Sequence, residues 1–176
     1  LEHLIRAGAE LADDGIRIDL YGYGELEEHY RAVIAELGLT NVRLCGPIAG
    51  TGQLLETLQR YDLFACPSVR TVDGDMDGIP TSVAEAMAAD LPVLTTALSG
   101  IPDLVTDGLT GLVCEAEPSA IARKVRDFYA MPRARVEAMI DAARRRVAEK
   151  HDVRRLTRVL TRIWTGRTID ILIIPW

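Results

Sequence analysis

The run from Asp77 to Ala88 holds two carboxylates, Asp77 and Glu85, with a predicted helix N-terminus between them. The free backbone N–H groups of a helix N-terminus bind anions, and flanking carboxylates accept hydrogen bonds from hydroxyl groups. Together these groups suit a ligand with phosphate at one end and a polyol at the other, such as a nucleotide-sugar. The residues alone equally support a structural interpretation, in which Asp77 caps the helix and Glu85 lies on its solvated face.

The acidic run from Asp73 to Gly78 begins like a calcium-binding loop. An EF-hand loop needs a bidentate Glu at its twelfth position. Counted from Asp73 that position is Ala84, and Glu85 misses it by one residue. The run also contains two Asp-x-Asp triplets, as used by some metal-dependent sugar transferases. We favour a solvated acidic loop and expect neither a metal nor a cofactor.

Gly22-Tyr23-Gly24 lies between a predicted strand and a predicted helix, where a dinucleotide-binding loop would lie. The full G-x-G-x-x-G fingerprint is not met, because Glu27 occupies the third glycine position. The next predicted strand, 41–45, is followed by Gly46 rather than by the acidic residue that would bind a ribose. The glycine pair therefore predicts a tight strand-to-helix turn.

Charge is unevenly distributed along the chain. Residues 1–118 contain 6 basic and 20 acidic residues, and residues 119–176 contain 14 basic and 6 acidic residues. One interpretation is an acidic body wrapped by a basic helical segment. The alternative is that the basic segment contacts an acidic partner or, peripherally, an anionic membrane surface. The net charge of −6 and the 5% aromatic content argue against a nucleic-acid partner.

The chain contains three cysteines, Cys45, Cys66 and Cys114, each beside apolar neighbours. An odd number without short spacings argues against a disulfide framework and against zinc, and predicts buried free thiols in a reducing compartment. No apolar run approaches the ~18 residues that span a bilayer. Since the chain opens inside a predicted helix, we expect the true N-terminus to lie further upstream.

Strand and helix patterns alternate along the chain. Helices are predicted over 1–13, 25–37, 52–60, 81–89, 118–130, 132–149 and 153–164, with a short one from Ser99, and strands over 16–21, 41–45, 62–66, 92–96 and 111–114. Short, apolar strands between helices predict an α/β fold, a Rossmann-like parallel sheet with helices on both faces that ends in a helical segment. In such sheets ligands bind at the loops that leave the carboxyl ends of the strands, here 22–24, 46–50, 67–80 and 97–101.

Several motifs in fixed order resemble the retaining, GT-B fold glycosyltransferases of the large group 1 family, also called family four. The hallmark is an acidic residue, seven residues, then Glu followed by Ala-Met-Ala. It is met from Asp77 to Ala88. Further matching runs are Tyr21-Gly22-Tyr23-Gly24-Glu25-Leu26, Tyr61-Asp62-Leu63-Phe64-Ala65-Cys66-Pro67-Ser68, Leu91-Pro92-Val93-Leu94-Thr95-Thr96 and Ser99-Gly100-Ile101-Pro102. The resemblance covers nearly all of residues 1–165 and implies the C-terminal, donor-binding half of a GT-B enzyme.

The resemblance also implies roles for particular residues. Glu85 would bind the ribose hydroxyls, and Asp77 would contact hydroxyls of the donor sugar. The backbone N–H groups of Gly78, Ile79 and Thr81 would face the diphosphate and sugar. The loop Gly46-Pro47-Ile48 would flank the base, and Ser68 and Pro80 complete the predicted substrate-binding set.

Three departures from the family pattern stand out. Asp77 replaces the usual Glu, which resembles members acting in exopolysaccharide assembly and predicts a different sugar choice. Asp90 replaces a glycine, so we expect left-handed backbone there. The family's first strand of this domain is absent, with its Arg and Lys for the diphosphate, and residues 1–118 contain no lysine.

We therefore expect a donor-binding domain over 1–165, with the acceptor domain missing, and a tail over 166–176 without an assigned role. The implied activity is sugar transfer from a nucleotide-diphosphate-sugar to a glycan or lipid-linked acceptor, in the cytoplasm or at the inner face of the membrane. The fragment alone is expected to be inactive. The alternatives are a GT-B fold nucleotide-sugar epimerase and a non-catalytic nucleotide-sugar binding module.

Overall fold

The computed structural model describes residues 1–69 and 80–151. Its elements, in order, are α1 (Glu2–Glu10), the 3-10 turn η1 (Ala12–Asp14), β1 (Ile18–Tyr21), α2 (Glu27–Glu36), β2 (Val42–Gly46), α3 (Gly50–Leu58), β3 (Phe64–Cys66), α4 (Thr81–Ala88), β4 (Val93–Thr95), α5 (Ile101–Leu104), β5 (Leu112–Val113), α6 (Pro118–Tyr129) and α7 (Arg133–His151). The helix predicted over 153–164 and the tail over 166–176 lie outside the described residues.

Each predicted element within the described residues is present, but most are shorter than expected. The strand predicted over 92–96 pairs only over Val93–Thr95, and that predicted over 111–114 only over Leu112–Val113. Strand length is set by the neighbour that supplies the hydrogen bonds, and β5 pairs only with Leu94 and Thr95 of β4. The predicted helix over 1–13 ends at Glu10, where the chain tightens into η1.

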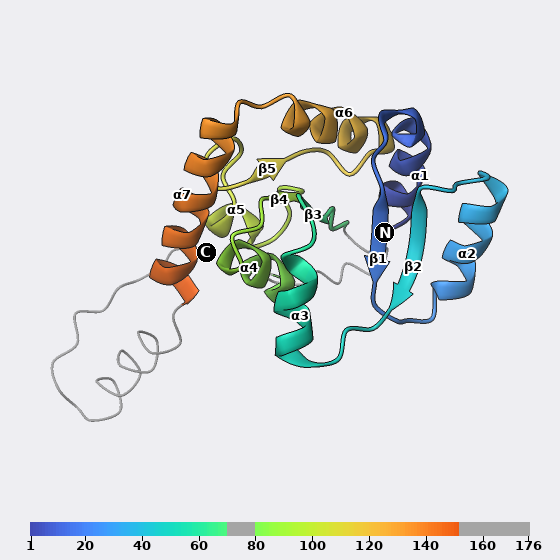
Figure 1. The fold of residues 1–176 in the computed structure, drawn as a ribbon, viewed down its shortest axis with the longest axis horizontal. Coiled ribbons are helices and arrows are strands. Elements are labelled where there is room, and N and C mark those ends of the chain that lie inside the picture. The colour runs from blue at the N-terminus through green and yellow to red at the C-terminus, as the bar shows by residue number, and fades with distance from the viewer. Residues whose placement is uncertain (70–79, 152–176) are drawn as a thin grey trace, which may run out of the picture.

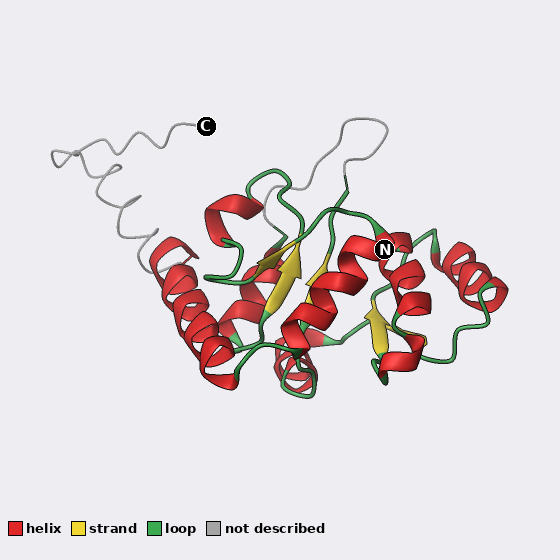
Figure 2. Cartoon of the chain, turned by 90° about the horizontal axis from the view of Figure 1, so that it is seen from above, coloured by secondary structure: helices red, strands yellow, loops and turns green. Residues whose placement is uncertain are grey.

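The strands form two parallel sheets rather than the one continuous sheet that the sequence predicts. One sheet has the order β1-β2 and the other β3-β4-β5. The edge of β1 faces the edge of β3 (Figure 1), but among the described residues no backbone pairing joins them. Figure 2 shows the strands of both sheets pointing toward the same side of the molecule.

Helices cover both faces of the three-stranded sheet, as predicted. A first core joins both sheets with α1 and α6 and includes Leu20 of β1 and Leu94 of β4. A second core lies on the opposite face, under α4, α5 and α7, and includes Val93. Leu94 and Val93 point to opposite faces because successive side chains of a strand alternate. The first core therefore holds the two sheets together by packing.

The described part of the basic segment pairs with the acidic body, which supports the wrapping interpretation. Lys124 of α6 lies 3.1 Å from the Asp107 carboxylate, and Arg126 donates to Asp14 at 2.8 Å. Arg144 of α7 donates to Asp90 at 2.7 Å. These pairs are largely exposed, so each stabilises the fold little and mainly orients the helices.

Asp90 has φ 63°, which confirms the left-handed backbone predicted at this position. It follows α4 and turns the chain toward β4. Its carboxylate accepts the hydrogen bond from Arg144, so the side chain that replaces the family's glycine has a partner of its own.

Gly8 of α1 gives a first testable prediction. A Cβ at this position would lie 2.5 Å from the Val42 side chain of β2, so glycine allows α1 to approach the sheet closely. We expect Gly8→Ala to destabilise the protein by about 1–2 kcal/mol, because overpacking outweighs the better helix propensity of alanine. Gly52 of α3 has open space around it, and Gly52→Ala should instead stabilise the protein slightly. Urea denaturation measures both, and a stabilised Gly8→Ala variant would contradict the packing argument.

Candidate functional site

The candidate site lies at the carboxyl ends of the parallel strands. Tyr21 of β1 is the register partner of Gly46 of β2, and Cys66 of β3 is the partner of Thr95 of β4. Gly46 is the last residue of β2, and the loops that follow β2 and β3 contain Pro47, Ile48 and Ser68, so four of the predicted site residues lie here. The edge predicted for ligand binding therefore holds them, divided between two sheets.

The turn after β1 and the loop after β2 are joined by a backbone hydrogen bond. The Gly22 N–H donates to the Gly46 carbonyl at 2.9 Å. Gly22 has φ 141° and Gly46 has φ 72°, backbone conformations that favour glycine. The turn itself lies slightly later than the predicted 22–24, because the Glu27 N–H donates to the Gly24 carbonyl at 3.1 Å. In the loop after β2, Pro47 is exposed and Ile48 is half-buried before α3 begins.

The start of α4 presents backbone N–H groups, including that of Thr81, and the predicted side chain of Glu85. Pro80 is the N-cap residue, and within the described residues no side chain caps this helix. Thr81 and Glu85 are both exposed and lie four positions apart, on one face of α4. Val83 and Met87 are fully buried in the second core, so the helix is firmly anchored behind that face. The arrangement can bind an anion at the helix N-terminus and accept hydrogen bonds at Glu85.

Ser68 is tied to the strand that neighbours β3. Its carbonyl accepts a hydrogen bond of 2.6 Å from the buried Thr96 hydroxyl, and its N–H donates to the Cys66 carbonyl at 2.9 Å. The loop after β3 is therefore fixed to the end of β4. The predicted residues Asp77, Gly78 and Ile79 lie outside the described residues, as does the acidic loop from Asp73.

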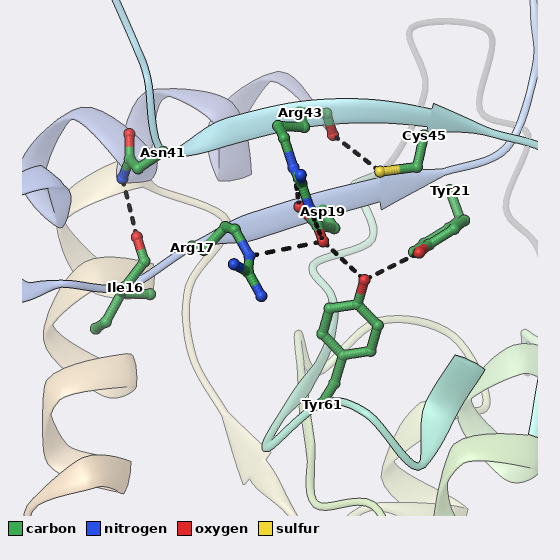
Figure 3. A network of polar contacts seen from close by, with 8 residues as sticks. All are labelled: Ile16, Arg17, Asp19, Tyr21, Asn41, Arg43, Cys45 and Tyr61. Carbon is green, nitrogen blue, oxygen red and sulfur yellow. Dashed lines mark hydrogen bonds and ion pairs between the residues drawn. The ribbon is translucent and has the colours of Figure 1, made fainter. Parts of the chain in front are cut away.

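Sequence reasoning missed a polar network between the sheets (Figure 3). The Tyr61 hydroxyl donates to the Asp19 carboxylate at 2.7 Å, and Arg43 binds the same carboxylate at 2.9 and 2.7 Å. The guanidinium of Arg43 holds the pKa of Asp19 below its usual range, and burial raises the pKa of Tyr61. The alternation of residues 16–21 was the available signal, because it places Arg17, Asp19 and Tyr21 on one face of β1.

The cysteines are free, but the prediction that all three are buried is wrong. Cys45 is exposed because it points to the polar side of β2, while Cys66 and Cys114 are partly buried. Burial raises the pKa of the Cys114 thiol. We expect iodoacetamide at pH 8 to alkylate Cys45 well before Cys114, since the thiolate is the reactive form. Peptide mass spectrometry over time measures this order, and equal rates in the folded chain would contradict it.

The described residues contain neither a metal-binding cluster nor a helix that could span a membrane. Residues 1–69 and 80–151 contain no group of three or more His, Cys, Asp or Glu side chains placed to hold a metal ion. In the same residues no helix combines the length and the apolarity that crossing a membrane requires.

Comparison with known proteins identifies the family of this chain. Residues 1–146 match the family described as "Glycosyl transferases group 1". Over 159 residues the chain is 33% identical to the protein named colanic acid biosynthesis glycosyltransferase WcaL of Salmonella typhimurium, covering 89% of this chain and 39% of that protein. It is 38% identical over 105 residues to the amylovoran biosynthesis glycosyltransferase AmsK of Erwinia amylovora, covering 58% of this chain and 26% of that protein. The chain thus spans two fifths or less of the length of these relatives.

A solved structure with the same fold is that of Anabaena Alr3699/HepE in complex with UDP-glucose. It superposes with a TM-score of 0.79 at 20% identity, covering 94% of this chain and 44% of that one. Since the family match extends over most of its residues, the chain belongs to the group 1 glycosyl transferases, with the α/β parallel-sheet architecture of GT-B glycosyltransferases.

Proposed function

We propose that this chain is the donor-binding domain of a retaining glycosyltransferase. The enzyme transfers a sugar from a nucleotide-diphosphate-sugar to a glycan or lipid-linked acceptor. The observation that carries the proposal is the start of α4, where Thr81 and Glu85 are exposed beside an N-terminus that no described side chain caps. Relatives named for colanic acid and amylovoran biosynthesis, and a fold neighbour in complex with UDP-glucose, support it.

Most of the predicted residues have a specific role in this proposal. Glu85 binds the ribose hydroxyls and Asp77 the hydroxyls of the donor sugar. The N–H groups of Gly78, Ile79 and Thr81 face the diphosphate and sugar, and Gly46-Pro47-Ile48 flank the base. Negative charge develops on the departing nucleotide, so the dipole of α4 favours the transition state over the bound donor.

We further propose that the enzyme needs polypeptide beyond these 176 residues. The chain spans two fifths or less of the length of the relatives that it matches, and in its described residues no backbone pairing joins the two sheets. A second domain would supply the acceptor site and cations for the diphosphate, and closing the cleft would exclude water. We place the enzyme in the cytoplasm, where its free thiols stay reduced.

The test is an assay of the polypeptide that the gene encodes against the 176-residue chain, with UDP-, GDP- and ADP-sugars. We expect sugar transfer with retained anomeric configuration from the longer polypeptide and none from the chain alone. Equal turnover by the chain would refute the need for a second domain. Nucleotide-sugar binding without transfer or hydrolysis by the longer polypeptide would favour a binding module.

A further inference from the structure

The predicted donor-binding residues belong to two sheets that share no backbone hydrogen bonds in the described part of the chain. Gly46 ends β2, in the two-stranded sheet, while Ser68 follows β3 of the other sheet and Thr81 and Glu85 belong to α4. Hydrophobic packing in the first core joins the sheets, but such packing is non-directional. A ligand that touches both sets of residues needs contacts that fix the position of one sheet against the other.

A directional contact of this kind runs through two tyrosine hydroxyls (Figure 3). An ionised carboxylate only accepts hydrogen bonds, so the Tyr61 hydroxyl donates to Asp19, at 2.7 Å. The Tyr61 oxygen is then free to accept from the Tyr21 hydroxyl, 3.0 Å away. The two rings meet edge to face, with centroids 6.1 Å apart. Tyr61 lies in the segment that leads into β3, whereas Asp19 and Tyr21 belong to β1.

Both ends of this contact are rigidly held. The Asp19 side chain is only 2% exposed and is bound by both nitrogens of the Arg43 fork, across from it on β2. A bidentate pair of this kind fixes geometry as well as charge. The Tyr61 ring packs against the second core, behind the three-stranded sheet. The hydrogen bond therefore connects a fixed point on one sheet to a fixed point on the other.

The contact reaches the loop that we assign to the base. Tyr21 is the register partner of Gly46, and the next residue, Gly22, donates the hydrogen bond to the Gly46 carbonyl. Movement of Tyr21 therefore moves the residue from which the loop Gly46-Pro47-Ile48 begins.

We propose that Asp19 and Tyr61 are positioning residues, which hold the loop after β2 in place against the sheet that bears α4. The role rests on the proposed function, because it serves a donor that contacts both sheets. Neither residue needs to touch the donor. Removing the Tyr61 hydroxyl loosens the loop and weakens donor binding while both cores stay packed.

The test uses Tyr61→Phe in the 176-residue chain, with UDP as the ligand followed by NMR titration. The expected loss of affinity is about fivefold, the lower end of coupling between sites. In the unliganded variant the Gly22 amide should exchange with solvent faster, while the melting temperature changes little. Tyr30→Phe is the matched control, since burial raises the pKa of this partly buried tyrosine on α2, which packs against the first core and does not belong to the contact of Tyr21, Tyr61 and Asp19. It should change neither the UDP affinity nor the exchange of Gly22.

The paired variants Asp19→Asn and Tyr61→Phe test whether the two residues act through one contact. The effects of these two variants on UDP affinity should be strongly non-additive, whereas the effects of Asp19→Asn and Tyr30→Phe should be additive. Unchanged UDP affinity in Tyr61→Phe overturns the positioning role. If the unsubstituted chain binds none of UDP, GDP and ADP, the donor-binding assignment fails by itself. Solvent exchange of the Gly22 amide then still decides whether the contact holds the loop. An unchanged exchange rate in Tyr61→Phe overturns the positioning role.

Discussion

Glu85→Gln should weaken nucleotide binding about tenfold or more. The carboxylate lies exposed on α4, one turn beyond Thr81, and accepts hydrogen bonds from the ribose hydroxyls in the proposed complex. A hydrogen bond to a charged group contributes about 1.5–3 kcal/mol, and each 1.4 kcal/mol changes a dissociation constant tenfold. Because Glu85 is on the surface and glutamine suits a helix, the fold should be unaffected. Calorimetry or NMR titration with UDP measures the change.

The matched control is Glu36→Gln, which removes the same charge from the exposed end of α2 that leads to the amino end of β2, whereas the site lies at the carboxyl ends of the strands. It should bind the nucleotide as the unsubstituted chain does. Equal affinities for Glu85→Gln and Glu36→Gln would reject the ribose-binding role and leave Glu85 as a solvated residue of the helix face.

Leu94→Ala should destabilise the protein by about 3–5 kcal/mol, the range for removing a fully buried leucine from a packed core. Leu94 is 0% exposed on β4 and packs in the first core, which holds the two sheets together. For a chain of this size the loss corresponds to a fall in melting temperature of about 10 °C. Thermal unfolding followed by circular dichroism measures it.

Leu109→Ala is the control for side-chain size, since Leu109 is 53% exposed and contributes little to either core. We expect its melting temperature to stay within about 2 °C of the original. A Leu94→Ala variant as stable as Leu109→Ala would mean that the first core does not hold the sheets together as described.

Local patterns predicted the elements better than the sheet that they build. The apolar run around Leu94 and the periodicity of α6 depend on neighbours close in sequence, and both elements are present. The division into two sheets depends on which strand edges meet, and residues far apart in the chain decide this. Gly8 shows the same difference. In the sequence it only weakens the predicted helix, because glycine has a low helix propensity. The close approach to Val42 in the structure explains why this position holds a glycine.

For the candidate site, motif order placed the loops correctly but left out the contacts between them. Ser68, Thr81 and Glu85 lie at the predicted strand edge and helix start. The Asp19–Tyr61 hydrogen bond joins residues 42 positions apart, and neither belongs to a motif with recognisable chemistry. Cys45 was predicted to be buried from its apolar neighbours, but those neighbours face the opposite side of β2. The roles of Asp77, Gly78 and Ile79 stay predictions, since these residues are not described.

The most direct test of the donor-binding assignment is a nucleoside diphosphate titration of the 176-residue chain by amide NMR. Without cations from further polypeptide the binding should be weak but saturable, with a dissociation constant of about 1 mM for the preferred base. The shifted amides should include Thr81 to Glu85 and the loop from Gly46 to Ile48. The absence of saturable shifts with UDP, GDP and ADP at about 10 mM would contradict the assignment. So would shifts confined to the groove that Ile34, Leu39 and Leu44 line between α2 and β2.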